Sequence, residues 1–196
     1  MKQQRSSSDK VRAIVRSSIE AKEAVLAGEA GSIAKAAAIV AKALRAGHTL
    51  FVFGNGGSAA DSQHIAAEFV GRFRKERSAL RAMALTVNTS SLTAIANDYG
   101  YDVSFSRQLE AFGCKGDVAL AISTSGNARN VLAAVRTARR LGLVTIGLAG
   151  GNGGGLAKAV DLAIVVPCTS TPRIQEAHIM IGHIVCELVE EELFGC

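Results

Sequence analysis

The sequence has no tryptophan, two prolines and four cysteines among its 196 residues. The cysteines show no CxxC spacing, so neither a zinc knuckle nor a redox-active pair is indicated, and reduced thiols are expected. No stretch approaches about 18 uninterrupted apolar residues, which argues against a membrane-spanning helix. The sequence therefore predicts a soluble cytoplasmic protein.

The motifs of nucleotide-binding proteins are also missing. The glycine-rich segment GNGGS at residues 54–58 is neither GxGxxG nor GxxxxGK[ST], and no lysine follows it to hold terminal phosphates. We therefore do not expect a nucleotide. The net charge of +5 suits an anionic small molecule as well as nucleic acid, so charge alone does not identify the partner.

What the sequence does contain is 48% hydrophobic residues and 20 glycines. This length and apolar content can bury one well-packed α/β core and are short for two, so we predict a single domain over residues 1–196. The glycines favour tight turns and close helix packing over long loops.

Residues 51–73 form the stretch around which the chain is organised. An apolar strand at 51–53 runs into the glycine turn, and a helix begins at Ser58, where Asp61 suggests a capping box. Glycines let the backbone approach a ligand, and the N–H groups at the helix start favour an anion. His64 and Glu68, four residues apart, lie on one face of this helix. A role in catalysis or in positioning an ion would explain Asp61 equally as well as a role in helix capping.

Two helices are predicted before the first strand, over residues 8–27 and 32–46, with a stop near Gly47. Each carries an apolar stripe, and one small domain can cover only one of them. This N-terminal helical hairpin is therefore expected to pack partly against other subunits. Residues 72–77 and Arg81 form a basic stretch, interpreted as a solvated helix end in preference to a device that steers an anionic substrate.

Apolar, β-branched strands alternate with helices along the rest of the chain. This alternation predicts an α/β three-layer sandwich whose five-stranded parallel sheet is covered on both faces. Residues 150–155 are expected to be a mobile glycine loop. A long final helix begins with Thr171 as its cap and Pro172 in its first turn. The strands are predicted at 51–53, 83–86, 117–122, 143–149 and 162–166, and the other helices at 91–96 and 128–141.

A second anion-binding turn follows the third strand. Ser123, Thr124 and Ser125 precede Gly126 and Asn127 at a helix start. Three hydroxyls and free N–H groups suit a phosphate monoester, whereas helix capping, the other explanation, needs one hydroxyl. Both turns lie at the carboxyl ends of strands, where parallel sheets bind their ligands.

Four segments, taken in order, resemble the sugar isomerase (SIS) domain and, within it, the phosphoheptose isomerases, also called sedoheptulose 7-phosphate isomerases. They are GNGGSAADSQHIAAEF, TAIANDYGY, AISTSGN and TPRIQEAHIMIGHIVCELVE. The resemblance covers nearly the whole chain. It implies the flavodoxin-like SIS fold and conversion of sedoheptulose 7-phosphate to glycero-manno-heptose 7-phosphate, towards bacterial surface polysaccharide. It also implies a phosphorylated sugar as partner, with neither nucleic acid nor membrane, and a homotetramer with active sites at subunit interfaces.

The resemblance assigns roles by motif position. Glu68 corresponds to the catalytic base and His183 to the catalytic acid. The zinc-associated positions are His64, Glu68, Gln175 and His183. The substrate-binding positions are Asn55, Gly56, Gly57, Ser58, Glu68, Asn97, Asp98, Ser123, Thr124, Ser125 and Gln175.

One position departs from the family, because Ala128 stands where a serine is usual, so a phosphate contact is lost or made by backbone alone. His178 is assigned to packing or to an interface, and Tyr99 and Tyr101 to structure. Zinc and a free base make competing demands on Glu68, and the sequence leaves its role open.

Two other functions remain compatible with the sequence. Relatives with this fold include tetrameric binding proteins without isomerase activity, one of which attaches to the replication initiator. They need not keep the acid–base pair, and the presence of both Glu68 and His183 favours an enzyme. An isomerase of another sugar phosphate is the second alternative, because phosphate recognition fixes only one end of the substrate.

Overall fold

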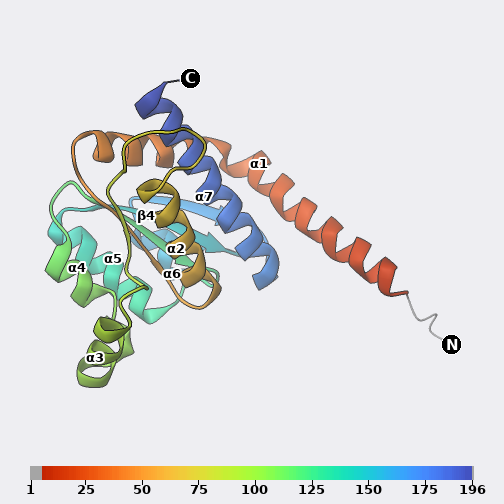
Figure 1. Cartoon of the computed structure of the whole chain (residues 1–196). Helices are drawn as coiled ribbons and strands as arrows, with labels where there is room; N and C mark the ends of the chain where they lie inside the picture. Colours follow the sequence, from red (N-terminus) through yellow and green to blue (C-terminus); the bar gives the residue numbers. More distant parts are fainter. Residues whose placement is uncertain (1–5, 196) are drawn as a thin grey trace.

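The computed structural model describes residues 6–195 and contains a parallel sheet with helices on both faces (Figure 1). The five strands lie in the order β2-β1-β3-β4-β5, and every neighbouring pair is parallel. The predicted fold class is therefore confirmed. The strand bounds are β1 Leu50–Gly54, β2 Ala82–Ala84, β3 Val118–Ser123, β4 Val144–Gly150 and β5 Leu162–Val166.

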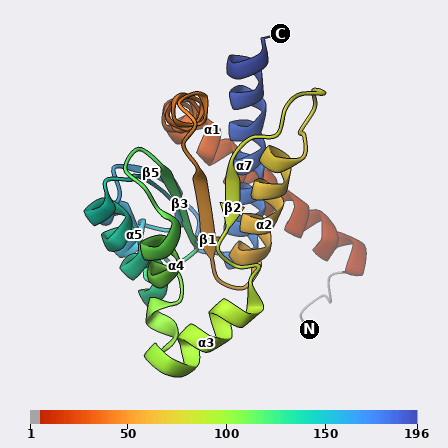
Figure 2. The same cartoon turned by 60° about the vertical axis from the view of Figure 1, so that its left-hand side comes forward.

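The helices form two layers and one projection (Figures 1 and 2). α1, α2 and α7 cover one face of the sheet, and α4, α5 and α6 cover the other. α3 extends from the body beside the 3-10 turn η1. The helix bounds are α1 Ser7–Arg45, α2 Gly57–Val70, α3 Thr89–Tyr99, η1 Tyr101–Val103, α4 Ser106–Phe112, α5 Arg129–Leu141, α6 Gly154–Ala159 and α7 Thr171–Phe194.

The first strand shows how the sequence builds both layers. Successive side chains of a strand point to opposite faces, so Leu50 and Val52 enter the core beneath α1 and α7. Phe51 and Phe53 enter the core on the side of α4 and α5. All five residues of β1 are buried, as expected for a parallel strand covered on both faces.

The strand order places the two anion-binding turns side by side. β1 pairs with β3, and Gly54 at the end of β1 stands opposite Ile122 near the end of β3. The chain adds β2 on one side of β1 and then β3 to β5 on the other, so the strand order reverses between β1 and β3. An open parallel sheet binds its ligand at such a switch point. The segments GNGGS and STSGN therefore face one region at the carboxyl edge of the sheet.

The predicted N-terminal hairpin is wrong, because α1 is one unbroken helix of 39 residues. Gly28 and Gly31, which fall between the two predicted helices, both lie within it. A glycine inside a helix costs about 1 kcal/mol relative to alanine, and the alanine-rich flanks outweigh that cost. The predicted stop is confirmed, because α1 ends at Arg45 and Gly47 has a φ of 82°.

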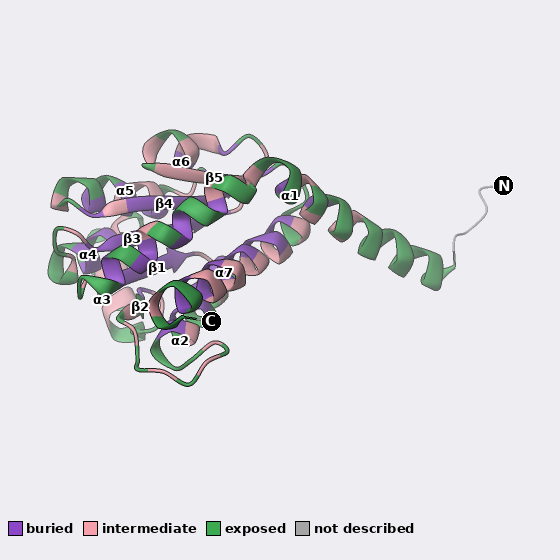
Figure 3. Cartoon of the chain, turned by 90° about the horizontal axis from the view of Figure 1, so that it is seen from above, coloured by how far each residue is buried: buried purple, intermediate pink, exposed green. Residues whose placement is uncertain are grey.

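The two halves of α1 differ in burial (Figure 3). Ile33 and Val40, in the second half, are at most 4% exposed and pack into the core. Val11, Ile14 and Val15, in the first half, are 52% to 59% exposed. α1 is long and apolar enough to cross a membrane by length and composition alone. This is weak evidence for a membrane span, since the core helix of a soluble protein can have the same length and composition.

Several boundaries also differ from the predictions. The segment expected to be a glycine loop contains the start of the short helix α6. The N-cap of α7 is Ser170 in place of Thr171, and Pro172 lies in the first turn as expected. Cys114, Cys168 and Cys186 are free thiols, and Cys196 lies outside the described residues.

Candidate functional site

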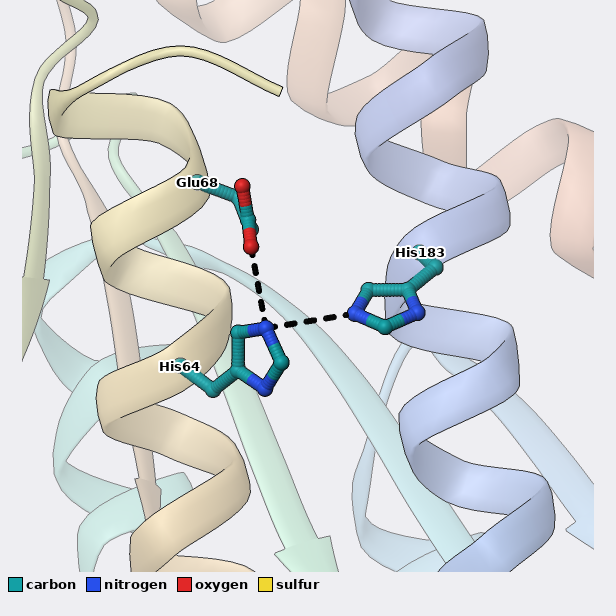
Figure 4. Close-up of side chains that lie close together, drawn as sticks. All are labelled: His64, Glu68 and His183. Carbon is teal, nitrogen blue, oxygen red and sulfur yellow. Dashed lines mark hydrogen bonds and ion pairs between the residues drawn. The ribbon is translucent and has the colours of Figure 1, made fainter. Parts of the chain in front are cut away.

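Three titratable side chains meet between α2 and α7 (Figure 4). His64 and Glu68 project from α2, and His183 projects from α7 toward them. His64 Nε2 lies 2.9 Å from Glu68 Oε1 and 3.4 Å from His183 Nε2. We call these three residues the acid–base cluster. The structure thus brings together the two residues predicted as base and acid, although their roles remain predictions.

The acid–base cluster is open to solvent. The side chain of His64 is 47% exposed and that of Glu68 is 23% exposed. The two imidazoles stand edge to face, with ring centroids 4.9 Å apart, and Phe73 lies on the other side of His183 with its centroid 5.6 Å away. A carboxylate and imidazoles are the side chains that most often serve as general bases and acids, so this arrangement suits proton transfer to and from a ligand.

The same three residues suit a metal ion. One ligand atom from each of them lies within 4.8 Å of the others, and imidazole nitrogen with carboxylate oxygen is a donor set that zinc accepts. Gln175, the fourth predicted position, lies about two helical turns before His183 on α7, where its amide group packs against Gly57 of the glycine turn. A β-carbon at Gly57 would collide with that amide, which explains the glycine.

Asp61 lies beside the acid–base cluster and does not cap α2. The N-cap of α2 is Gly56, and none of the described residues provides a side-chain hydrogen bond there, so the predicted capping box is wrong. Asp61 Oδ2 is buried and has no hydrogen-bond partner among residues 6–195. Burial raises the pKa of this carboxyl, while the nearby His64 and His183 lower it. A carboxylate so placed adds negative potential where a cation would sit.

The second predicted turn lines a cavity of about 260 Å³ at the carboxyl edge of the sheet. Thr124 and Ser125 contribute to it, together with Gly150, Gly151 and Thr171. Ser123 is buried at the end of β3. The cavity therefore offers hydroxyls and backbone groups to a ligand.

Helix capping does not explain these hydroxyls. The N-cap of α5 is Ala128, and within the described chain no side chain caps this helix. The Ser125 hydroxyl accepts a hydrogen bond of 3.2 Å from the Asn127 N–H, ahead of the helix. Among the first N–H groups of α5, that of Val131 donates to the Asn130 Oδ1 over 3.0 Å, and those of Arg129 and Asn130 have no side-chain acceptor in the described chain, as a phosphate site requires.

Asn55 in the glycine turn is held by two residues that the sequence analysis did not connect with it. Its amide exchanges hydrogen bonds of 2.8 and 2.9 Å with the buried Asn130, and Tyr101 donates one of 3.0 Å to its Oδ1. Asn130 follows Asn55 by 75 residues, and no local motif links them. Ser58 is buried in the first turn of α2.

Asn97 and Asp98 lie on α3, which buries none of its own residues in the described chain. Both are exposed, and Asn97 donates a hydrogen bond of 2.8 Å to the Asp98 carboxylate. α3 lies away from the acid–base cluster within one chain (Figures 1 and 2). Among the described residues, neither side chain makes a hydrogen bond to the acid–base cluster, whereas Tyr101, three residues after Asp98, donates one to Asn55 of the glycine turn.

His178 is confirmed as a packing residue. It is fully buried, and its Nε2 lies 3.1 Å from the Ala149 carbonyl oxygen. Burial lowers the pKa of this imidazole to about 4, and the carbonyl opposes that shift. His178 is therefore neutral at pH 7, and its Nε2–H donates a hydrogen bond to the Ala149 carbonyl near the end of β4.

Comparisons with known proteins agree with this geometry. The SIS domain family model matches residues 15–150. A phosphoheptose isomerase from Clostridium acetobutylicum is 54% identical over 187 residues, which cover 94% of this chain and 95% of the relative. One from Geobacter sulfurreducens is 54% identical over 186 residues, covering 95% and 98% of the two chains.

The solved structures lead to the same group. The structure of a phosphoheptose isomerase from Neisseria gonorrhoeae superposes with a TM-score of 0.90 at 40% identity, covering 95% of this chain and all of that one. A phosphoheptose isomerase from Francisella tularensis superposes with a TM-score of 0.92 at 35% identity, over the same shares.

Proposed function

The chain belongs to the phosphoheptose isomerase family of SIS domain proteins, and on that premise we propose that it interconverts sedoheptulose 7-phosphate and glycero-manno-heptose 7-phosphate. The observation that carries this proposal is the meeting of Glu68 and His183, which project from the separate helices α2 and α7 on one face of the sheet. The product would serve heptose synthesis for a bacterial surface polysaccharide in the cytoplasm.

The reaction moves a proton between two neighbouring carbons of the sugar through an enediol. It needs a base over the carbon and an acid near the oxygens. We assign the base to Glu68 and the acid to His183. His64 contacts both and can hold the Glu68 carboxylate in place, since its Nε2 lies 2.9 Å from Glu68 Oε1.

The phosphate end of the substrate is assigned to the cavity after β3. Ser123, Thr124 and Ser125 supply hydroxyls, and the N-terminus of α5 supplies uncapped N–H groups. Asn55, Gly56 and Gly57 would contact the sugar chain, with the Asn55 amide fixed by Asn130. Ala128 has no hydroxyl, so at its position the backbone alone would contact the phosphate.

We further propose that His64, Glu68, Gln175 and His183 would hold one zinc ion. When bound, zinc would supply electrophilic stabilisation of negative charge on the sugar oxygens. The three converging donors and the unpartnered Asp61 oxygen support a cation here. Loss of activity in a chelator, with recovery on added zinc, is the expected result; full activity in metal-free buffer would contradict it.

A homotetramer is proposed as the working assembly. An apolar groove of about 430 Å³ runs between α1 and α7 and is lined by Ile19, Leu26, Met180 and Ile184 among others. Together with the exposed first half of α1, it suits a second copy of the chain. Such a copy could also bring Asn97 and Asp98 to the site. A monomeric mass in light scattering at micromolar concentration would contradict the proposal.

A panel of ketose phosphates in deuterated water tests the activity. We expect sedoheptulose 7-phosphate to exchange hydrogen at C1 or C2 and to be converted to the aldose, as read by NMR. Exchange of a different ketose phosphate would reassign the substrate. If none of them exchanges, the protein is not an isomerase of these sugars.

A further inference from the structure

A second charged group joins the α2 region to α7, two helical turns beyond His183. Arg77 lies in the loop between α2 and β2, and Glu190 lies on α7. Arg77 Nε donates to Glu190 Oε1 over 2.9 Å, and their side chains are only 2% and 3% exposed. We call this pair the clasp. Arg77 is thus the exception in the basic stretch that was expected to be solvated, because Arg72 and Arg74 are 60% and 66% exposed.

Arg77 binds the end of the helix that carries Glu68. Its two terminal nitrogens donate to the backbone carbonyls of Glu68, at 2.7 Å, and Phe69, at 2.8 Å. The last carbonyls of a helix have no partner within the helix, and a buried cation there satisfies them and complements the helix dipole. The position of the Glu68 backbone therefore depends directly on Arg77.

Glu190 acts on the other member of the acid–base pair. Its carboxylate accepts hydrogen bonds from three successive backbone N–H groups, those of Phe73 at 3.2 Å, Arg74 at 2.8 Å and Lys75 at 2.9 Å. The ring of Phe73 in turn packs against the imidazole of His183. Glu190 thus fixes the position of Phe73, whose ring packs against His183.

We propose that Arg77 and Glu190 are positioning residues that fix the separation of Glu68 and His183 for proton transfer. This inference rests on the acid–base roles proposed above. Glu190 lies seven residues after His183, so both project from the same side of α7. One buried ion pair therefore joins the backbone of the proposed base to the helix of the proposed acid.

The obvious alternative is that the clasp only stabilises the fold, and a matched variant separates the two. Asp117, just before β3, is also a buried carboxylate that accepts backbone N–H groups, those of Thr49 and Cys114, each at 2.8 Å. Its partners are Thr49, Cys114 and His48, and none of them belongs to the clasp or to the acid–base cluster. Glu190→Gln and Asp117→Asn each replace one such carboxylate by its amide.

The experiment measures kcat, KM and the unfolding midpoint of both variants at a temperature where each is folded. Misplacing catalytic groups by about 1 Å can lower a rate by about a hundredfold, so we expect Glu190→Gln to lower kcat about ten- to a hundredfold with little change in KM. Asp117→Asn should keep its kcat within about twofold while its midpoint falls, because Asp117 shares no hydrogen-bond or ion-pair partner with the acid–base cluster or the clasp. An unchanged kcat in Glu190→Gln would overturn the proposal.

A second readout does not need turnover. In histidine-labelled protein, the NMR signal of the His183 ring should move in Glu190→Gln, because Phe73 shifts against it. The His48 signal should not change in Glu190→Gln. It should move in Asp117→Asn, since His48 Nδ1 lies 3.6 Å from Asp117 Oδ1. An unmoved His183 signal in Glu190→Gln would overturn the proposal. This readout remains valid if the wild type is inactive on sedoheptulose 7-phosphate, so failure of the proposed function and failure of this proposal can be told apart.

Arg77→Lys replaces Glu190→Gln if that variant does not fold. Lysine keeps the charge, but its single nitrogen cannot reach both Glu190 and the α2 carbonyls in the way that the guanidinium fork does. The same decrease in kcat and the same His183 shift are expected, and their absence again overturns the proposal.

Discussion

The acid–base cluster and the clasp both bridge the α2 region and α7, but they differ in exposure. His64 and Glu68 present 47% and 23% of their side chains to solvent, whereas Arg77 and Glu190 present 2% and 3%. The cluster holds each side chain by one or two contacts. The clasp satisfies its charges with several hydrogen bonds from side chains and backbone.

The difference shows two uses of charge on the same pair of helices. Groups that exchange protons with a substrate must be reachable and able to change protonation state. Groups that hold a geometry do so best where water cannot compete and where every donor and acceptor has a partner. Changes in the cluster should therefore affect chemistry, and changes in the clasp should affect stability as well.

The largest effect is expected from the acid–base cluster. Glu68→Gln and His183→Ala should each lower kcat by a factor of about 100 to 10,000, the usual contribution of a positioned acid or base. Because both side chains are partly exposed, the unfolding midpoint and the oligomer should change little. Steady-state kinetics with light scattering checks this, and a near-normal rate in either variant would remove that residue from its assigned role.

The next effect concerns stability at the clasp. Glu190→Ala leaves the Arg77 charge and three backbone N–H groups buried without their acceptor, and removing one partner of a buried pair costs about 3–5 kcal/mol. Denaturant unfolding measures this loss. The matched surface variant is Asp9→Ala, which breaks an exposed pair with Arg12 and should change the free energy of unfolding much less, because solvent screens that pair. Equal losses in the two variants would contradict the distinction between buried and exposed charge.

The smallest effect is the pH dependence of the clasp. Burial raises the pKa of Glu190, but the N–H groups of Arg74, Lys75 and Phe73 and the Arg77 guanidinium outweigh it, so the pKa lies below its ordinary value of 4.5. The unfolded chain therefore binds this proton first on acidification. The stability that Glu190 contributes is complete above pH 4.5 and is lost as the pH falls through the lower pKa of the folded protein.

Unfolding of the wild type and of Glu190→Gln at several pH values tests this dependence. The difference in free energy of unfolding between them should be constant from pH 7 to about pH 5 and should shrink at lower pH. His178, whose pKa burial lowers to about 4, destabilises both proteins alike over part of this range and cancels in the difference. A difference that does not change with pH would show that the charge of Glu190 makes no contribution.

Much of the candidate site could be predicted from sequence because its signals are local. His64 and Glu68 are four residues apart, and both anion-binding turns are short runs of glycine or hydroxyl residues directly after strands. Residues that act through distant partners were missed. The Asn55 amide is fixed by Asn130, 75 residues later, and no local sequence pattern indicates that the two residues are partners.

The basic stretch after α2 gives the clearest case of a wrong interpretation. In sequence, Arg77 looks like its neighbours Arg72 and Arg74, and a run of cations at a helix end is most often solvated. Its partner Glu190 is 113 residues away, on the last helix. Only when α7 packs beside α2 does the guanidinium meet both a carboxylate and the helix carbonyls.

By itself the sequence determined the alternation of strands and helices and the parallel sheet, since periodicity is written in neighbouring residues, while the prediction of Glu68 and His183 as base and acid came from the resemblance to a known family. Only the tertiary structure decided that Asp61 does not cap its helix and that Arg77 is buried. The physical reason is that burial and hydrogen-bond partnership depend on which distant segments pack together, and packing energies of several kcal/mol outweigh local preferences of about 1 kcal/mol or less.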